Sequence, residues 1–297
     1  MNERSFITSG MNEAAVLNRP IVEEALDPSH ALREVVLLGE RVTYRALPGR
    51  GAPLLAIHGL GSDGRDLLDL SERLGHPTVL IDLPGFGASA RPERAYTVRR
   101  AAEVSLALLN HLGWVRPIWL GASYGAHVAL RAALDSPARV ERLVLLSAGG
   151  LDPDPPAALR EHFREERLAG RTRQELAATL AILAKRNTPA TEAYASRRLA
   201  LHGARVAPGK SDLRAVARSA QGALRDDAPR RLEEIFQPTE LVHGTGDPLV
   251  AMSVVEAASK RLPRGRLRPL SGLGHLPWLE SPAEVAAHLR LALEPSA

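Results

Sequence analysis

Three side chains of this sequence have the types that covalent acyl transfer requires. Ser123 lies at the centre of the small-x-Ser-x-small pentapeptide GASYG, Asp247 lies within GTGDP, and His275 ends the run GLGH. A serine hydroxyl is a poor nucleophile at neutral pH, so a histidine must take its proton during attack and return it to the leaving group. A carboxylate on the other imidazole nitrogen fixes the tautomer and stabilises the imidazolium. We therefore predict Ser123 as the nucleophile, His275 as the base and Asp247 as the acid that orients it.

The pentapeptide around Ser123 predicts a strained turn. An apolar run leads into it and a helical pattern follows it, and a serine forced into such a turn needs small neighbours two positions away. Gly121 and Gly125 occupy those positions. Taken alone, the same residues also fit a serine that caps the N-terminus of an ordinary helix.

The oxyanion of a tetrahedral intermediate needs preorganised hydrogen-bond donors. The backbone N–H of Tyr124 directly follows the predicted nucleophile, and Leu60 lies in a glycine-rich loop after an earlier apolar run. We predict that the amides of Leu60 and Tyr124 form the oxyanion hole. Gly59 and Gly61 let the backbone of this loop approach closely, and His58 is expected to hold it through hydrogen bonds.

The acid and the base each have an alternative interpretation. Asp152 and Asp154 follow the strand before the long helical region, so they compete with Asp247 for the acid role. His275 also fits a structural histidine in a glycine-rich loop.

The surrounding hydrophobic pattern predicts an α/β fold. It predicts strands at 34–38, 41–47, 53–57, 78–81, 116–120, 140–146, 239–243 and 264–270, and helices at 63–74, 97–112, 126–134, 157–169, 191–202, 250–262 and 283–293. Apolar strands that alternate with helices form a mostly parallel sheet, here of eight strands, with helices on both faces. Ligands bind beyond the carboxyl ends of such strands, so Ser123, Asp247 and His275 should face one crevice.

The order of the elements also predicts the domain organisation. Residues 31–150 and 237–297 carry the alternating strand and helix pattern, whereas residues 151–236 carry only helix signals. We predict an α/β core from the first two ranges and a helical insertion, residues 151–236, after the sixth strand. Residues 1–30 lack a clear period and are predicted to form an N-terminal extension.

Composition excludes several classes of function. The chain has no cysteine, which excludes disulfides, thiolate metal sites and cysteine nucleophiles. Residues 151–236 contain 16 Arg and Lys against 12 Asp and Glu, and the rest of the chain has 22 of each, so the net charge of +4 lies in the predicted insertion. These charges are interleaved, which favours a solvated helical surface over a nucleic-acid site and leaves an anionic substrate open.

The same pattern predicts the cellular setting and the partners. No apolar run reaches the roughly 18 residues of a membrane span, and the first thirty residues lack a signal-peptide pattern. We expect a cytoplasmic monomer or homodimer that acts on a small-molecule substrate, without a membrane or nucleic-acid partner.

Five ordered motifs are similar to those of the α/β-hydrolase superfamily, in its branch with a helical cap. They are HGLG at 58–61, DLPGFGAS at 82–89, GASYG at 121–125, HGTGD at 243–247 and GHLPWLE at 274–280. The resemblance runs from about residue 34 to the end of the chain. It implies an acyl-enzyme mechanism that uses no metal or other cofactor, and a cap that shapes the pocket.

Two groups within the superfamily differ from this chain at informative positions. Haloalkane dehalogenases and epoxide hydrolases are similar, but they carry an aspartate where this chain has Ser123, so their reactions are not expected. The carbon–carbon bond hydrolases of vinylogous diketone acids resemble it at residues 149–151 and at Arg198, where they have an arginine for the substrate carboxylate. This chain departs from them at Ala122 and Leu276, where asparagine and tryptophan are usual.

We therefore expect a hydrolase of carboxylic esters with a mainly apolar acyl or alcohol part. Carbon–carbon hydrolysis, lactonase and thioesterase activity are alternatives, and a ligand receptor or non-catalytic interaction protein is an alternative of another class. By their places in the motifs, Gly59, Arg198 and Leu276 are expected to contact the substrate. Candidate pocket residues of the cap, which also fit its own core, are Leu159, Phe163, Leu176, Leu180, Leu183 and Tyr194.

Overall fold

The computed structural model describes residues 30–92, 96–164, 172–203 and 212–293, so the predicted N-terminal extension lies outside the described residues apart from His30. The strands are β1 (Arg33–Leu37), β2 (Glu40–Leu47), β3 (Leu54–Ile57), β4 (Thr78–Asp82), β5 (Ile118–Ala122), β6 (Arg142–Leu146), β7 (Thr239–Gly244) and β8 (Gly265–Leu270). The α-helices are α2 (Leu68–Leu74), α3 (Val98–His111), α4 (Tyr124–Asp135), α5 (Ala157–His162), α7 (Arg173–Leu183), α8 (Pro189–Gly203), α9 (Asp212–Leu224), α10 (Met252–Arg261), α11 (Pro277–Glu280) and α12 (Pro282–Leu293). None of these described helices combines the length and the apolar character that a membrane span requires.

One eight-stranded sheet runs through the molecule in the order β1-β2-β4-β3-β5-β6-β7-β8. The first two strands form an antiparallel hairpin, and β2 pairs antiparallel with β4. The remaining neighbours pair in parallel. The predicted fold, a mostly parallel eight-stranded α/β sheet of the hydrolase type, is confirmed.

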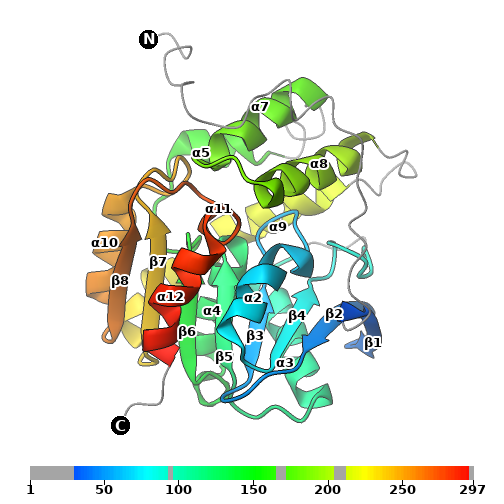
Figure 1. Cartoon of the computed structure of the whole chain (residues 1–297), viewed down its shortest axis with the longest axis vertical. Helices are drawn as coiled ribbons and strands as arrows, with labels where there is room; N and C mark the ends of the chain where they lie inside the picture. The colour runs from blue at the N-terminus through cyan, green and yellow to red at the C-terminus, as the bar shows by residue number, and fades with distance from the viewer. Residues whose placement is uncertain (1–29, 93–95, 165–171, 204–211, 294–297) are drawn as a thin grey trace.

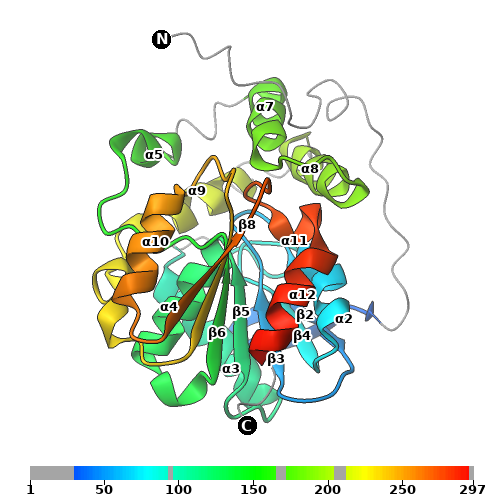
Figure 2. The same ribbon diagram turned by 60° about the vertical axis from the view of Figure 1, so that its left-hand side comes forward.

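Helices cover both faces of the sheet because its central strands, such as β3 and β5, are apolar on both sides. Successive side chains of a strand point to opposite faces. In β3, Leu55 and Ile57 join the apolar cluster that includes α3, α4 and α10, whereas Leu54 and Ala56 join the cluster that includes α2 and α12. Figure 2 shows α2 and α12 on one side of the sheet and α4 and α10 on the other.

The junction between β5 and α4 is tighter than predicted. The strand predicted for 116–120 is found at Ile118–Ala122, because Pro117 has no N–H for the ladder and the first strand bond is donated by Ile118 to Pro53 O at 2.8 Å. The helix predicted from residue 126 already begins at Tyr124. Only one residue, Ser123, therefore separates strand from helix.

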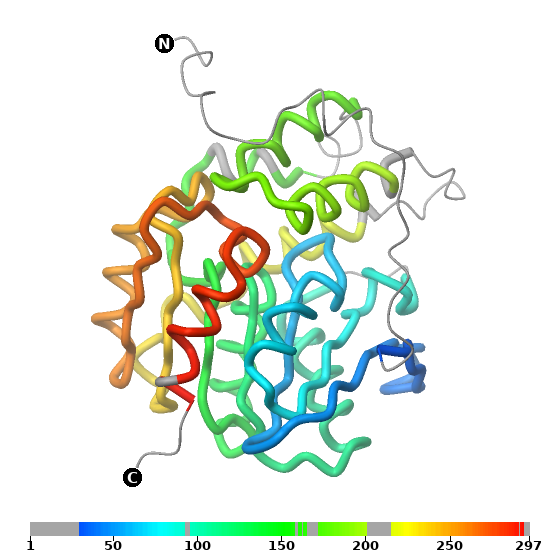
Figure 3. Tube along the Cα trace, viewed as in Figure 1, coloured from blue at the N-terminus to red at the C-terminus, as the bar shows by residue number. Residues whose placement is uncertain are grey.

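A helical segment with α5, α7, α8 and α9 joins β6 to β7, and we refer to it as the cap segment. It lies over one end of the sheet (Figures 1 and 3). Where a helix was predicted for 157–169, the structure has α5, which ends at His162. Residues 165–171 lie outside the described residues. The domain boundaries predicted at 150 and 236 stay predictions.

Candidate active site

Ser123 occupies a strained turn between β5 and α4. Its backbone has φ 51° and ψ −109°, a positive φ that residues other than glycine rarely adopt. Gly121 and Gly125 permit the crossing, since a Cβ on Gly121 would lie 2.4 Å from the carbonyl carbon of Gly125, and one on Gly125 would lie 2.1 Å from the Ile57 oxygen. The Ser123 hydroxyl makes no capping bond to α4. The sharp turn, and not an ordinary N-cap, is what the chain forms here.

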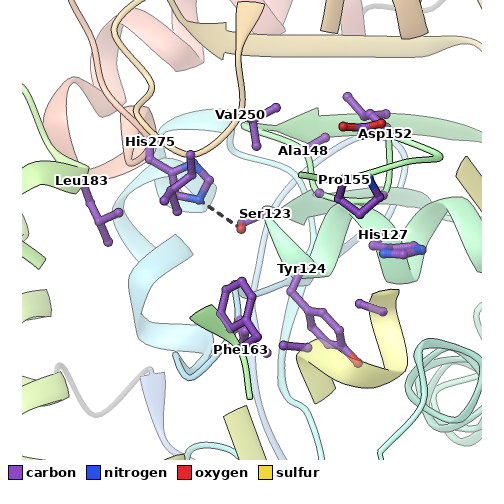
Figure 4. A pocket seen from close by; sticks show the side chains of 18 of the residues that line it. Ser123, Tyr124, His127, Ala148, Asp152, Pro155, Phe163, Leu183, Val250 and His275 are labelled. Atoms are coloured by element: carbon purple, nitrogen blue, oxygen red, sulfur yellow. Dashed lines mark hydrogen bonds between the residues drawn. The ribbon is translucent and has the colours of Figure 1, made fainter. Parts of the chain in front are cut away.

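The structure brings the three predicted catalytic side chains together. His275 Nε2 lies 3.0 Å from Ser123 Oγ, and His275 Nδ1 lies 2.7 Å from Asp247 Oδ2 (Figure 4). The second oxygen of Asp247 accepts the backbone N–H groups of Leu249 and Val250 at 2.8 and 3.1 Å. A continuous hydrogen-bonded chain therefore runs from a fixed carboxylate to the serine hydroxyl.

The environment of Asp247 keeps this carboxyl ionised. Burial alone would raise its pKa, but the charge and hydrogen bond of His275, with the amide of Leu249 among further contributions, outweigh burial and hold the pKa of Asp247 below its ordinary value. An ionised Asp247 accepts the proton on His275 Nδ1, which leaves Nε2 as the acceptor for the Ser123 hydroxyl. This is the tautomer that a general base requires.

The two competing acids have other partners. Asp154 Oδ1 accepts from Arg230 Nη2 at 2.8 Å, and Asp152 Oδ1 accepts the backbone N–H of Asp154 at 2.9 Å. Among the described residues, Asp247 is the carboxylate that meets His275.

The loop that follows β3 carries Leu60 beside the serine. His58 is buried and bridges two backbone groups, donating from Nδ1 to Gly59 O at 2.7 Å and accepting the N–H of Leu83 at Nε2 at 3.0 Å. Burial lowers the pKa of His58, so the ring stays neutral in this bridging tautomer. The other predicted donor, the amide of Tyr124, lies in the first turn of α4, where helix N–H groups have no intrahelical partner.

Ser123 and His275 line a cavity of about 350 Å³ between the sheet and the cap segment, with mainly apolar walls (Figure 4). The three predicted substrate contacts, Gly59, Arg198 and Leu276, all line it. Five of the six predicted cap residues also line it, namely Phe163, Leu176, Leu180, Leu183 and Tyr194, whereas the side chain of Leu159 lies outside the described residues.

The cavity has a polar region that sequence reasoning missed. His127, one helical turn after Ser123, lines the cavity on the other side of the serine from His275 (Figure 4). Its Nε2 lies 3.1 Å from Asp226 Oδ1, and the fully buried Arg131 donates to Asp227 at 2.7 Å. The spacing of four residues from Ser123 was the only signal in the sequence that could have pointed to His127.

Glu280 is a second group that sequence reasoning missed. Its buried carboxylate accepts the N–H groups of Gly274 at 3.0 and 3.1 Å and of Leu276 at 3.2 Å, the two residues that flank His275. It also accepts the N–H groups of Lys185 and Arg186 in the cap segment at 2.8 and 3.0 Å. Glu280 therefore ties the histidine loop to the cap segment.

We expect Glu280→Gln to lower kcat by about tenfold to a hundredfold with a smaller change in KM, because an amide NH₂ would face the N–H donors that position His275. The pH–rate profile of kcat/KM and the unfolding temperature should be measured together. Glu284→Gln is the matched control, since Glu284 pairs with Arg186 at the surface at 3.4 Å. A loss of stability with an unchanged kcat and pH profile would show that Glu280 is structural only.

Comparison with known proteins gives the chain a family. The family model described as "Alpha/beta hydrolase family" matches residues 54–288. An uncharacterized protein of Mycobacterium tuberculosis is 35% identical over 118 residues, which are 39% of this chain and only 34% of that relative. The magnesium-chelatase 30 kDa subunit of Rhodobacter capsulatus is 31% identical over 248 residues, 77% of this chain and 82% of that protein.

A solved structure shows the same architecture. A thermophilic esterase from Thermogutta terrifontis is similar with a TM-score of 0.75 and 24% identity, and the match covers 89% of this chain and 98% of that one. At this identity the similarity establishes the fold, whereas the family model establishes descent across most of the chain. Together with the motifs placed around Ser123, these matches show that the chain belongs to the alpha/beta hydrolase family.

Proposed function

We propose that this protein is a serine hydrolase that cleaves carboxylic esters through an acyl-enzyme intermediate. The observation that carries the proposal is the chain of hydrogen bonds from Asp247 through His275 to Ser123, with distances of 2.7 and 3.0 Å. The serine end of this chain opens on a mainly apolar cavity. Such a cavity suits an ester with an apolar acyl or alcohol part.

Acylation begins when Ser123 Oγ attacks the ester carbonyl carbon and His275 Nε2 takes the hydroxyl proton. The carbonyl π electrons move to the oxygen, and the amides of Leu60 and Tyr124 donate to the resulting oxyanion. The intermediate collapses, the bond to the alcohol oxygen breaks, and His275 gives its proton to that leaving oxygen. The acyl group is now esterified to Ser123.

Deacylation repeats these steps with water. His275 removes a proton from a water molecule as the water attacks the acyl carbon, and it returns that proton to Ser123 Oγ when the acyl–serine bond breaks. The products are a carboxylic acid, an alcohol and the free serine. Asp247 stays ionised throughout and stabilises the imidazolium in both halves.

Two residues favour esters over vinylogous diketone acids as substrates. Ala122 is buried, and its side chain cannot hydrogen-bond to a substrate oxygen. Leu276, in the cavity wall, supplies only apolar contact. The side chains that the proposed ester hydrolysis requires are all present. Two residues that are usual in the carbon–carbon bond hydrolases, at positions 122 and 276, are replaced.

Multiple-turnover kinetics on a substrate panel test this proposal. The panel holds p-nitrophenyl esters of graded chain length, a lactone, a thioester and a vinylogous diketone acid, and a fluorophosphonate probe titrates the reactive serine. We expect many turnovers per protein on the esters, abolished by prior labelling. Labelling without a second turnover on any ester would overturn the proposal in favour of a receptor, and preferred cleavage of the diketone acid would overturn the ester class.

The Rhodobacter relative favours a second candidate function, that of a subunit associated with a magnesium chelatase. The supporting observation is 31% identity over 82% of a protein that carries that name. Chelatase activity in extracts of a strain that lacks this chain separates the candidates, with add-back of the wild-type protein or of Ser123→Ala. Equal restoration by both proteins supports a non-catalytic subunit, and restoration by the wild type alone supports a hydrolytic role in that setting. Unchanged chelatase activity without the chain contradicts this candidate.

A further inference from the structure

Two neighbouring arginines of the cap segment contact the loop that carries the predicted oxyanion donor and the residues just after it. Both belong to α8. Arg198 Nη1 donates to the backbone oxygen of Leu60 at 2.9 Å, and Arg197 Nη2 lies 2.6 Å from Asp66 Oδ1, just after the loop. The two contacts join residues 138 and 131 positions apart in the chain. One helix of the cap segment therefore contacts the loop at Leu60 and the short 3-10 helix that follows it, Gly64–Leu67, at Asp66.

The loop has little support from the sheet itself. Residues 59–62 belong to no strand, and within the loop the Ser62 N–H donates to Gly59 O at 3.2 Å. The amide of Leu60 donates to no acceptor among the described residues, as expected for a group reserved for an oxyanion. The core holds the loop through the His58 bridge at one end and, just after the other end, through the Gly64 N–H, which donates to Asp82 Oδ1 of β4 at 2.9 Å. Between these points, Arg198 of the cap segment binds the Leu60 carbonyl.

The guanidinium of Arg198 packs against further groups beside its bond to Leu60. Gly61 has φ +69°, and a Cβ there would overlap the Arg198 guanidinium, so the guanidinium packs directly on the loop backbone. On its own helix, Arg198 lies with its guanidinium carbon 5.9 Å from the centre of the Tyr194 ring. The guanidinium therefore lies between an aromatic ring and the loop, a position from which it can fix the Leu60 peptide.

Arg197 compensates a buried charge just after the same loop. The Asp66 side chain is 4% exposed, one of its oxygens accepts the hydroxyl of Ser62, and the other meets Arg197. Burial raises the pKa of Asp66 to about 6, and the charge of Arg197 opposes that rise. Removing Arg197 would leave this carboxylate without its ion-pair partner at the base of the loop.

We propose that Arg198 is a positioning residue for the oxyanion hole, which orients the Leu60 amide by binding the Leu60 carbonyl, and that the Arg197–Asp66 pair fixes the base of the same loop. This inference rests on the proposed ester hydrolysis. It assigns Arg198 a different role from the substrate-carboxylate contact that its motif position implies. Oxyanion donors act only when they are preorganised, so loosening the loop should lower kcat and leave substrate binding nearly unchanged.

Arg198→Gln and Arg198→Lys test the first half of the proposal. Each variant is assayed on a neutral p-nitrophenyl butyrate and on a p-nitrophenyl ester whose acyl chain ends in a carboxylate. We expect Arg198→Gln to lower kcat by about 10- to 100-fold on both esters, with KM within about threefold, and Lys to recover part of the loss. The rate of fluorophosphonate labelling should fall in parallel, because phosphonylation of Ser123 uses the same donors.

Arg173→Gln is the matched control. Arg173 also donates to a backbone carbonyl, that of Leu199 at 2.8 Å, but both residues belong to the cap segment and neither is in the loop. Its kcat and labelling rate should match those of the wild type. A change of the same size in Arg173→Gln would overturn the proposal, because it would trace the effect to general loosening of the cap segment.

The kinetics distinguish failure of the positioning role from failure of the proposed ester hydrolysis. If Arg198→Gln raises KM only for the carboxylate ester and leaves kcat for the neutral ester unchanged, Arg198 binds the substrate and the positioning role is wrong. If the wild type labels but turns over neither ester, the proposed function fails. The labelling rates of the variants then still decide whether Arg198 positions the hole.

A single and a double variant test the second part of the proposal, that the Arg197–Asp66 pair fixes the base of the loop. Arg197→Gln should lower both kcat and the unfolding temperature, since it leaves Asp66 unpaired in a buried site. Adding Asp66→Asn in the same chain removes that charge and should restore most of both quantities. If the double variant is no better than Arg197→Gln alone, the ion pair does not support the loop.

Discussion

Ser123→Ala is expected to lower kcat for a short p-nitrophenyl ester by about 10⁴- to 10⁶-fold and to leave the fold intact. The Ser123 hydroxyl is the proposed nucleophile, and within the described residues it is hydrogen-bonded to His275 Nε2. Alanine keeps the Cβ and therefore the same strained φ of 51°. The substitution should consequently add no backbone strain, and the unfolding temperature should stay within about 2 °C of the wild type.

Ser147→Ala is the matched control for this result. Ser147 is a second buried serine at positive φ, 41°, just after β6, and its hydroxyl has no hydrogen-bond partner among the described residues. Ser147→Ala should leave kcat within about twofold of the wild-type value, because Ser147 holds no atom that reacts in the transition state. Undiminished, enzyme-dependent ester hydrolysis by Ser123→Ala would remove Ser123 as the nucleophile.

Asp247→Asn is expected to lower kcat by about 10³- to 10⁴-fold with little change in KM. In this variant the side-chain amide oxygen would keep the bonds from Leu249 and Val250, so the amide NH₂ group would face His275 Nδ1. An imidazole that accepts at Nδ1 carries its proton on Nε2, and it can no longer accept the proton of Ser123. Steady-state kinetics on one ester across a pH range of about 5 to 9 measure this effect.

Asp152→Asn is the control that separates the two acids. Asp152 lines the cavity but its carboxylate accepts the N–H of Asp154, and it should be replaceable with less than about a fivefold loss of kcat. If Asp152→Asn were the inactive variant and Asp247→Asn the active one, the acid of the mechanism would be Asp152.

The sequence was most informative where function depends on local order along the chain. The hydrophobic pattern predicted all eight strands, most clearly the central ones such as β3 and β5, because strands buried on both faces are mainly apolar. Ser123, Asp247 and His275 each follow one of those strands, and the carboxyl ends of parallel strands meet at one edge. Residues 28 and 152 positions apart could therefore be placed together before any contact was known.

The ends of the helices and strands were predicted less accurately than their order along the chain. The predicted starts of β5 and α4 each differ from the observed starts by two residues. Hydrophobicity marks the middle of an element, whereas Pro117 determines where β5 begins and the strained Ser123 determines where α4 begins. The helix at 63–74 likewise divides into a short 3-10 helix, Gly64–Leu67, and α2, with Asp63 accepting from the N–H of Arg65 at the start.

The sequence by itself determined the fold class, the turn around Ser123 and the three residues that it brings to one edge of the sheet. Only the tertiary structure decided which groups support them: Glu280 beside the histidine loop, His127 and Asp226 at the far side of the cavity, and Arg198 on the carbonyl of Leu60. The contacts of Glu280 with Lys185 and Arg186, of His127 with Asp226, and of Arg198 with Leu60 join the cap segment to the core across long separations in the chain. No periodicity along the sequence encodes such contacts, because they depend on how the cap segment packs over the sheet.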